Sequence, residues 1–405
     1  MVDQKRVAKT GNEAMAEAMR QINPDVVAAY PITPATEIAQ IFSSFVSDGL
    51  VKTEFVTVES EHSAMSATVG ASAAGSRAMT ATSSQGLALM HEILYIAAGL
   101  RLPIVMPMVN RALSSPINIH CDHSDTMGSR DAGWIQIYAE NCQEAYDSVI
   151  QAVKIAEKAF VPAMVSTDGF IISHAMEDIL MLPDEEVQKF AGPFKGPYNL
   201  LDTDHPITVG ALDFTDFYFE HLKSQSESMR LAKPIVREVG KEFGEKYGRP
   251  YDFFDAYKLE DAETVIVVLG STAGTARVAI DRLRSKGIKA GMLRIRVYRP
   301  FAEAELAELL KGAKAVAVLD RSDSKNAVGG PVYNDVRAAM YDSSSRPLIV
   351  NYIYGLGGRD IFVEDIEKVY IELAQGIKAG KPSNKVNYLG VRDVCDVQTK
   401  IKEKV

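Results

Sequence analysis

The sequence predicts an α/β fold made of two parallel-sheet domains, and three patterns predict it. β-rich runs alternate with helical patterns along most of the chain. The expected strands are apolar almost throughout, which is typical of strands buried on both faces of a sheet. The alternation is interrupted between residues 183 and 262. We therefore expect a first domain at residues 1–182, an extended connector at 183–262 and a second domain at 263–405.

In the first domain, strands and helices follow one another in turn, as in a parallel sheet with crossover helices. Its strands are expected at Val26–Tyr30, Glu54–Val58, Arg77–Thr82, Pro103–Val109 and Val161–Thr167. Its helices are expected at Pro34–Val46, Ser63–Ala74, Leu87–Leu100 and Gln143–Ala159.

The second domain repeats this alternation, beginning near Glu263. Its strands are expected at Thr264–Leu269, Lys289–Ile295, Ala313–Leu319 and Pro347–Tyr352. Its helices are expected at Ala273–Ser285, Ala302–Leu310 and Val332–Met340.

The segment between the two domains has a different composition, rich in Phe, Tyr, Lys, Glu and Pro. One stretch of it, Asp216–Ala232, has a helical pattern. We interpret the segment as a connector that wraps the domains, without a core of its own.

Composition and charge exclude several classes of protein. The net charge of -9 and the pI near 5.4 argue against binding nucleic acid or an anionic membrane. The polar start and the lack of a long apolar run predict neither a secretory signal nor a membrane span. The three cysteines, Cys121, Cys142 and Cys395, are too few and too dispersed for a self-contained zinc or iron–sulfur site. A cytoplasmic location is expected.

Two strand-to-helix turns offer polar groups at the same expected edge of the first sheet. Thr33 follows the first strand and is expected to cap a helix that begins at Pro34. The second turn carries the carboxylates Glu59 and Glu61 at the start of a helix. Ligands bind at the carboxyl edge of such sheets, so the two turns predict a site. Ser83–Gly86 follows another strand and is expected to lie beside it.

A long loop, Asn110–Gly133, opens with Arg111 directly after a strand. Structureless loops of this length are usually functional. A guanidinium at the sheet edge is suited to binding a carboxylate through two parallel hydrogen bonds. The loop also contains His120, Cys121, Asp122 and His123, but these lack the spacing of a helical metal site, so we expect them to order the loop or contact a partner.

Several blocks of the sequence resemble one enzyme family: YPITPATE, VESEHSA, TSSQGLALM, VNRALSSPINIHCDHSD and GSRDAGWIQIYAENCQEAYDS. They are similar to the α subunit of pyruvate:ferredoxin oxidoreductase (pyruvate synthase), in the thiamine-diphosphate-dependent 2-oxoacid:ferredoxin oxidoreductase family. The resemblance continues through PYNLLDTDHP in the connector. The later block VIVVLGSTAGTARVAIDRLRSKGIKAGMLRIRVYRPF is similar to the C-terminal domain of transketolase-type enzymes. The first domain is therefore expected to be a pyrimidine-binding domain for thiamine diphosphate.

The resemblance implies a role for three residues. The family's cofactor carboxylate falls on Glu61, which would hydrogen-bond the aminopyrimidine ring and help to activate the cofactor. The family's substrate-binding threonine and arginine fall on Thr33 and Arg111, and Arg111 would hold the 2-oxoacid carboxylate. Taken alone, each residue has a structural explanation: a helix cap for Thr33, a carboxylate favoured by a helix N-terminus for Glu61, and an interdomain salt bridge for Arg111.

Two glycine-rich segments have weaker patterns. Gly270–Gly274 lacks the full glycine pattern of a phosphate site and any P-loop lysine, so we interpret it as a tight strand–helix turn. Gly355–Arg359 is interpreted as a turn as well.

The chain lacks parts that the family's reaction needs. It has no Gly-Asp-Gly segment for the diphosphate and Mg²⁺, and no cysteine cluster for electron transfer. The resemblance therefore implies a β subunit with the diphosphate and Mg²⁺ site, γ and δ (ferredoxin-like) subunits, [4Fe-4S] clusters on these partners, and ferredoxin. Coenzyme A would be the co-substrate, no metal would bind to this chain, and the assembly would be a dimer of heteromers.

The function that follows is reversible oxidative decarboxylation of pyruvate to acetyl-CoA and CO2, with reduction of ferredoxin. One alternative keeps the chemistry and changes the substrate to 2-oxoisovalerate, 2-oxoglutarate or oxalate. An oxalate-oxidising relative is expected to differ around two of the three site positions, which weighs against oxalate. A further alternative is a non-catalytic scaffold subunit, and retention of Glu61, Thr33 and Arg111 argues against it.

Overall fold

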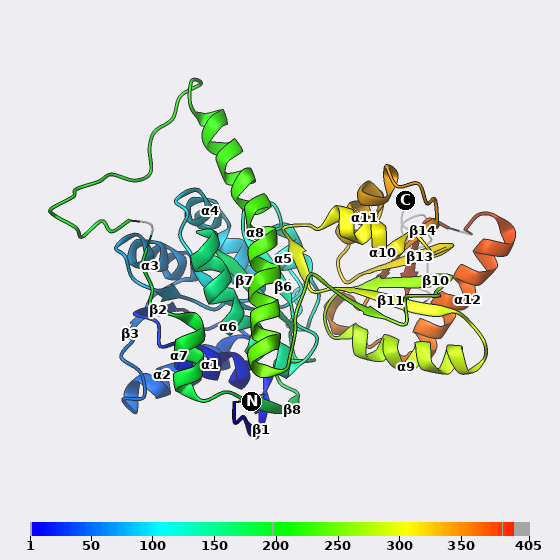
Figure 1. The fold of residues 1–405 in the computed structure, drawn as a ribbon, viewed down its shortest axis with the longest axis horizontal. Coiled ribbons are helices and arrows are strands. Elements are labelled where there is room, and N and C mark those ends of the chain that lie inside the picture. Colours follow the sequence, from blue (N-terminus) through cyan, green and yellow to red (C-terminus); the bar gives the residue numbers. More distant parts are fainter. Residues whose placement is uncertain (1, 197, 383, 393–405) are drawn as a thin grey trace, which may run out of the picture.

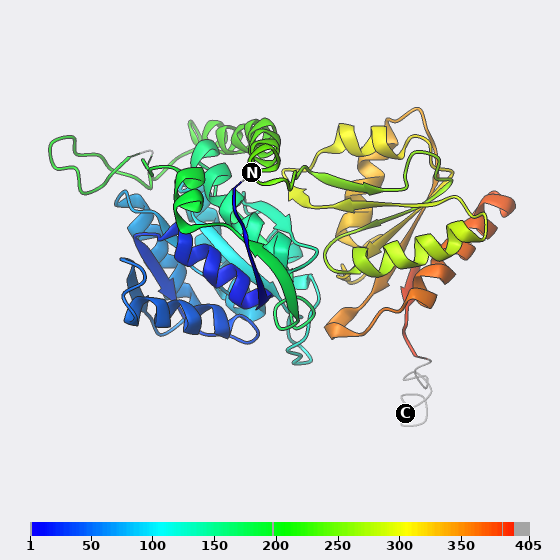
Figure 2. The ribbon, with the colours of Figure 1, turned by 60° about the horizontal axis from the view of Figure 1, so that its bottom comes forward.

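The computed structural model describes residues 2–196, 198–382 and 384–392. The chain forms two lobes, each built on a twisted sheet, and they lie side by side in Figures 1 and 2. The fold is α/β, with mostly parallel sheets covered by helices, as the sequence predicts.

In the described part of the chain, seven strands form the sheet of the first lobe, in the order β12-β6-β7-β5-β4-β2-β3. All neighbours are parallel except β12 and β6. The strands are β2 (Val26–Ala29), β3 (Glu54–Thr57), β4 (Ala78–Met79), β5 (Val105–Asn110), β6 (Ile135–Tyr138), β7 (Ala163–Asp168) and β12 (Val297–Arg299). The last of these comes from the C-terminal half of the chain and crosses back to this sheet.

Helices cover both faces of this sheet, because alternate strand residues point to opposite sides. Val105 and Val165 belong to one apolar core, with α1, α2, α6 and α8, while Met106 and Met164 belong to another, with α3 and α4. The helices named so far, together with the short α5 and α7, are α1 (Gly11–Ile22), α2 (Thr36–Ser47), α3 (Glu61–Ala73), α4 (Ser84–Gly99), α5 (Ser124–Gly128), α6 (Cys142–Ala159), α7 (Asp184–Ala191) and α8 (Tyr218–Tyr247).

A small antiparallel ribbon lies beside the first core. It pairs β1 (Lys5–Thr10) with β8 (Met176–Met181). The alternation pattern did not predict these two strands. It also did not predict α1, which lies between β1 and β2 in the sequence.

The helix α8 is longer than the sequence predicts. The helical pattern indicated Asp216–Ala232, but α8 continues through Pro234 to Tyr247. Val239 and Phe243 on its second half are fully buried in the first core, and this burial offsets the backbone hydrogen bond that proline cannot donate. In both views the segment before α8 extends away from the first lobe (Figures 1 and 2).

Six strands of the described residues form the second sheet, in the order β15-β14-β13-β10-β11-β9. All pairs are parallel except β11 with β9. The strands are β9 (Phe254–Tyr257), β10 (Thr264–Val268), β11 (Ala290–Ile295), β13 (Ala315–Asp320), β14 (Leu348–Tyr354) and β15 (Val386–Leu389). The helices α9 (Thr272–Ser285) and α12 (Val363–Ala379) pack on one face, and α10 (Glu303–Leu310) and α11 (Pro331–Tyr341) pack on the other.

The topology brings the turns of interest to one place. The parallel strands β5, β4, β2 and β3 are consecutive neighbours, so their carboxyl ends lie along one edge of the first sheet. Within the ranges that the structure describes, no helix combines the length and apolar character needed to cross a membrane.

Candidate functional site

Glu61 is the first residue of α3, at the carboxyl edge of the first sheet. Ser60 caps this helix by accepting a hydrogen bond from the Ser63 backbone N–H at 3.2 Å. The Glu61 side chain does not extend into solvent, since the residue is 7% exposed. A buried carboxylate at a helix N-terminus is stabilised by the positive end of the helix dipole. It is therefore a strong hydrogen-bond acceptor held in a fixed position.

Gly86, in the first turn of α4, leaves room for the Glu61 side chain. A Cβ atom on Gly86 would lie 2.8 Å from Glu61 Oε1 and 2.3 Å from Thr82 Oγ1, so only glycine fits there. The hydroxyls of Thr82 and Ser83 are buried, and neither has a hydrogen-bond partner among the described residues. Buried polar atoms are normally satisfied, so these hydroxyls fit a site that receives a polar ligand. The structure thus places the Ser83–Gly86 turn beside Glu61, as the sequence predicts.

Arg111 follows β5 directly and is also 7% exposed. Its Nε donates to the Asn118 carbonyl at 3.0 Å and its Nη1 donates to the Thr33 carbonyl at 2.9 Å. Burial lowers the pKa of the guanidinium below its ordinary value. In the described part of the chain it forms no ion pair, so the interdomain salt bridge is absent there. A buried cation bound only by backbone carbonyls is suited to receive an anionic ligand.

Thr33 lies next to Arg111, but the predicted helix cap is wrong. Residues 32–35 form a turn in which the Ala35 N–H bonds the Ile32 carbonyl at 2.8 Å. This turn delays α2 to Thr36, with Ala35 as the residue before it and no side-chain cap. Thr33 is exposed, and its backbone carbonyl accepts the hydrogen bond from Arg111.

Asp125 belongs to the charged residues of the long loop, but the sequence assigned it no role of its own. It lies at the start of α5, is buried, and accepts backbone N–H bonds from Arg111 at 2.9 Å and from Ser84 at 3.1 Å. It also accepts from the Asn110 side chain and from the Thr126 backbone. Burial raises its pKa to about 6, although these hydrogen bonds oppose the shift. Asp125 therefore ties the turn after β4 to the turn after β5.

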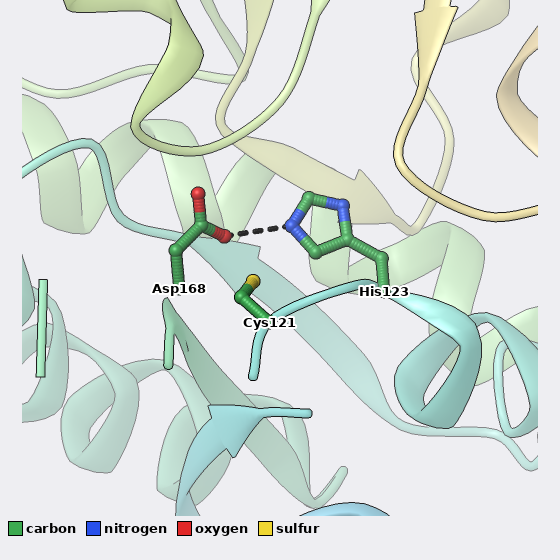
Figure 3. Close-up of side chains that lie close together, drawn as sticks. All are labelled: Cys121, His123 and Asp168. Atoms are coloured by element: carbon green, nitrogen blue, oxygen red, sulfur yellow. Dashed lines mark hydrogen bonds and ion pairs between the residues drawn. The ribbon is translucent and has the colours of Figure 1, made fainter. Parts of the chain in front are cut away.

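Cys121, His123 and Asp168 form a buried cluster between the lobes, shown in Figure 3. One ligand atom from each residue lies within 4.8 Å of the others, which is compatible with metal binding. However, His123 Nε2 lies 2.7 Å from Asp168, and Arg321 Nη1 donates to Asp168 at 2.8 Å and lies 3.8 Å from the Cys121 sulfur. The Arg321 guanidinium already balances the Asp168 charge. The cluster thus orders the loop and joins it to the second lobe.

The pKa values of this cluster agree with that interpretation. Burial by itself would raise the pKa of Asp168, but Arg321 and His123 hold it below its ordinary value, so the carboxylate is ionised. Burial raises the pKa of the Cys121 thiol well above its ordinary value, so the thiol is neutral. The ionised Asp168 carboxylate therefore forms a buried ion pair with the Arg321 guanidinium, and the neutral Cys121 thiol lies beside this pair.

The turn at Gly270 and Ser271 is a structural turn, consistent with the sequence interpretation. Ser271 donates both its backbone N–H, at 3.0 Å, and its hydroxyl to Asp168. Gly270 has a φ of 65°, and a Cβ atom on it would lie 2.9 Å from both oxygens of the same carboxylate. The turn therefore binds a carboxylate of the first lobe, and this contact crosses between the two sheets.

Comparison with known proteins defines the class: the chain is a component of a thiamine-dependent oxidoreductase. A family model described as "Pyruvate flavodoxin/ferredoxin oxidoreductase, thiamine diP-bdg" matches residues 17–241. A second model, "Pyruvate:ferredoxin oxidoreductase core domain II", matches residues 262–366. The chain belongs to the pyruvate:ferredoxin oxidoreductase family and corresponds to its α subunit.

Curated relatives match almost the whole chain. It is 56% identical to "Pyruvate synthase subunit PorA" of Thermotoga maritima over 96% of this chain and 98% of that protein. It is 46% identical to the same-named subunit of Pyrococcus furiosus, again over 96% and 98%. It is also 44% identical to "Ketoisovalerate oxidoreductase subunit VorA" of Pyrococcus abyssi, over 96% and 99%.

Solved structures share the fold at lower identity. The 2-oxoglutarate:ferredoxin oxidoreductase of Magnetococcus marinus superimposes with a TM-score of 0.69 at 22% identity, over 92% of this chain and 65% of that longer chain. A split-gene transketolase superimposes with a TM-score of 0.53 at 13% identity, over 90% and 98%. At these identities the similarity concerns the fold alone.

Proposed function

We propose that this chain is the α subunit of a pyruvate synthase, in which Glu61 binds the pyrimidine half of thiamine diphosphate while Arg111 and Thr33 orient pyruvate. The observation that carries the proposal is the buried Arg111 guanidinium, bound by the Thr33 carbonyl at the sheet edge that also carries Glu61. The names of the 56% and 46% identical relatives support pyruvate as the substrate.

The groups around Glu61 fit the aminopyrimidine ring. The carboxylate can accept a hydrogen bond from a protonated ring nitrogen, and the hydroxyls of Thr82 and Ser83 lie beside it in the same turn region. Thiamine diphosphate, when bound, supplies the carbanion chemistry that decarboxylation of a 2-oxoacid requires. Glu61 orients the cofactor and holds a proton at the ring nitrogen, while its burial keeps water from competing for that hydrogen bond.

Arg111 and Thr33 act on the substrate. The guanidinium offers parallel N–H donors that match a carboxylate, and its partial desolvation strengthens that interaction. Two of its nitrogens are already fixed by backbone carbonyls, so little side-chain entropy is lost when the substrate binds. The exposed hydroxyl of Thr33 extends this contact surface toward the 2-oxoacid.

The reaction requires partner subunits. We propose a β subunit carrying the diphosphate and Mg²⁺ site, γ and δ subunits, [4Fe-4S] clusters on these partners, ferredoxin as electron acceptor and coenzyme A as acyl acceptor, in a cytoplasmic dimer of heteromers. The chain's division at 1–182, 183–262 and 263–405 belongs to the same proposal. The relatives' names contain the word subunit.

Exposed apolar side chains on α4, namely Leu89, Tyr95 and Ile96, support a subunit contact on that helix.

A second candidate substrate is 2-oxoisovalerate. The observation that favours it is the 44% identity to a ketoisovalerate oxidoreductase subunit, which is close to the 46% identity to a pyruvate synthase subunit. Both substrates have the carboxylate and keto groups that Arg111 would orient, so they differ only in the side chain that the pocket must accept.

The experiment is a ferredoxin-reduction assay on the whole purified complex with a panel of 2-oxoacids and coenzyme A. We expect the highest kcat/KM with pyruvate and formation of acetyl-CoA. A higher kcat/KM with 2-oxoisovalerate would assign the chain to the second candidate. A complex that assembles but neither binds thiamine diphosphate nor turns over any 2-oxoacid would identify the chain as a scaffold subunit.

A further inference from the structure

The second lobe contacts the loop that carries Arg111. The turn Gly355–Gly358, which follows β14 in the second sheet, lies against residues 118–122 of that loop. The Gly358 N–H donates to the Cys121 carbonyl at 2.6 Å, and the Gly357 N–H donates to Asp122 at 3.3 Å. The Asn118 side-chain amide donates to the Gly357 carbonyl at 3.1 Å. A turn that carries no catalytic group of its own is thus bonded to the loop at three points.

Asn118 connects this turn to Arg111. Its carbonyl accepts the hydrogen bond from Arg111 Nε at 3.0 Å, while its Nδ2 is the atom that donates to Gly357. Its Oδ1 accepts the His120 backbone N–H at 2.6 Å, which fixes the side chain's orientation. One residue therefore transmits the position of the second lobe to the guanidinium.

Glycine is required for this contact. Gly357 and Gly358 have φ values of 62° and 79°, in the left-handed region that other residues rarely adopt. A Cβ atom on Gly357 would lie 2.4 Å from Asn118 Nδ2, and one on Gly358 would lie 2.4 Å from the His120 Cβ. The first of these contacts would push directly on the residue that binds Arg111.

The loop is anchored to the second lobe at a further point. The His123 N–H donates to the Arg321 carbonyl at 2.7 Å, and Arg321 also pairs with Asp168. Residues 118–123 are therefore held from both ends by the second lobe. The loop segment between Arg111 and Asn118 is short. Movement of the second lobe would therefore move Asn118, whose carbonyl accepts the hydrogen bond from the Arg111 guanidinium.

We propose that the second lobe braces the 2-oxoacid site, with Gly357 and Asn118 as positioning residues for Arg111. This inference rests on the proposed role of Arg111. Among the described residues, the hydrogen bonds of Asn118 and Gly357 go to the Arg111 loop and to each other, and none goes to Glu61. Loss of the brace should therefore weaken 2-oxoacid binding and leave cofactor binding intact. The second lobe then has a function in substrate recognition without contributing a group to the reaction.

The test compares two glycine variants of the whole complex. Gly357→Ala adds a methyl group against Asn118, while Gly287→Ala adds one at a φ of 80° in the same lobe with no atom within 4 Å. Both variants carry the same left-handed strain, but one disturbs the brace. For Gly357→Ala we expect the KM for pyruvate to rise about tenfold, as for loss of one charge-assisted hydrogen bond. The kcat and the affinity for thiamine diphosphate should stay within about twofold of the values for Gly287→Ala.

Asn118→Ala provides a second test that does not depend on backbone strain. It removes the side-chain bonds and keeps the carbonyl that accepts from Arg111. We expect a rise in KM of the same kind, about threefold to tenfold. If the Gly357→Ala complex fails to assemble, the KM of Asn118→Ala for pyruvate decides whether the second lobe braces Arg111. Equal KM values for Gly357→Ala and Gly287→Ala, or a parallel fall in kcat and thiamine binding, would overturn the brace.

Arg111→Lys in the same assay separates this inference from the proposed function. If Arg111→Lys raises the KM and the brace variants do not, the brace is wrong and the role of Arg111 stands. If Arg111→Lys leaves the KM unchanged, the proposed substrate contact is wrong, and the brace through Arg111 is wrong with it.

Discussion

Arg111 is the residue at which the proposed substrate contact is most directly tested. Arg111→Lys keeps the charge and loses the planar pair of donors. We expect the kcat/KM for pyruvate to fall about tenfold to hundredfold, which corresponds to a lost charge-assisted contact of roughly 1.5–3 kcal/mol. Thiamine diphosphate affinity should change little. Thr33→Ala should have a smaller effect, and the double variant should be non-additive because both residues face one substrate.

A different outcome would give Arg111 a structural role. If Arg111→Lys separated the complex into subunits while the remaining intact complex kept its pyruvate kinetics, the residue would stabilise an interface. Gel filtration of the variant complex alongside the kinetic assay distinguishes the two roles.

Glu61 has a matched control two residues away. Glu61→Gln keeps the size of the side chain but cannot hold the cofactor's proton in the same way, so turnover at saturating thiamine diphosphate should fall by orders of magnitude while the complex still assembles. Glu59 is exposed and bonds only Ser63 among the described residues. Glu59→Gln should therefore keep normal turnover. The opposite result for the two variants would move the cofactor role to Glu59.

Asp125 predicts a pH dependence of substrate binding. Its folded-state pKa of about 6 lies above the ordinary 3.8, so folding favours the protonated form, and the free energy of unfolding falls as pH rises between these values. Protonation below about pH 6 removes an acceptor from the N–H groups of Arg111 and Ser84. We expect the kcat/KM for pyruvate to fall as pH drops through about 6.

The variants Asp125→Asn and Asp131→Asn check this assignment. Asp125→Asn should have a low kcat/KM that lacks the inflection near pH 6, because it leaves buried N–H donors unpaired at every pH. Asp131 lies in the same loop and is exposed, so Asp131→Asn should keep the inflection. An unchanged pH profile in Asp125→Asn would show that another group titrates.

The second half of α8 continues beyond the helical pattern of the sequence, so its packing against the core must stabilise it. Phe243 is fully buried in the first core, whereas Phe219 on the same helix is 77% exposed. Phe243→Ala should lower the free energy of unfolding by about 3–5 kcal/mol, while Phe219→Ala should change it by less than about 0.5 kcal/mol. Denaturant unfolding of both variants measures the difference. Equal, small effects would show that the second half of α8 does not contribute to the core.

The elements that the sequence predicted share a strong local signal. The strands β10, β11 and β13 are short apolar runs, and the helices α6 and α9 have clear periodicity, so their bounds were predicted within two residues. β12 was not predicted, because a three-residue strand that crosses to the first sheet has no local pattern. The sequence pattern placed the end of α8 too early, because burial of the helix against α6 determines where it ends.

The site residues divide in the same way: some have a local sequence pattern, and others depend on contacts with distant parts of the chain. Arg111 could be found because it directly follows a strand, and Glu61 because it lies at the start of the helix after a strand, with the family resemblance deciding between Glu59 and Glu61. Asp125 and Asn118 act through partners that lie elsewhere in the chain or in the other lobe. No spacing in the sequence reveals such partners, so the roles of these two residues were found only from the structure, whereas the Ser83–Gly86 turn was expected beside the site.

The two lobes are joined through Asp168. It receives hydrogen bonds from Arg321 and Ser271 of the second lobe and contacts His123 of the Arg111 loop. Because the carboxylate is fully buried, loss of one partner would leave an uncompensated charge, which is strongly destabilising. The ion pair therefore favours one arrangement of the lobes, and that arrangement is the one in which the site is formed.

The isolated chain should carry only half of the cofactor site. The chain has no Gly-Asp-Gly segment and no cysteine cluster, so it offers the pyrimidine half of the cofactor site without a diphosphate half or iron ligands. The purified chain alone should be colourless, contain no stoichiometric iron and bind thiamine diphosphate weakly. Adding the proposed β subunit should restore tight, Mg²⁺-dependent binding, measured by calorimetry, since the two half-sites then act together. Stoichiometric iron in the pure chain, or tight cofactor binding without a partner, would contradict the proposed division of the site between subunits.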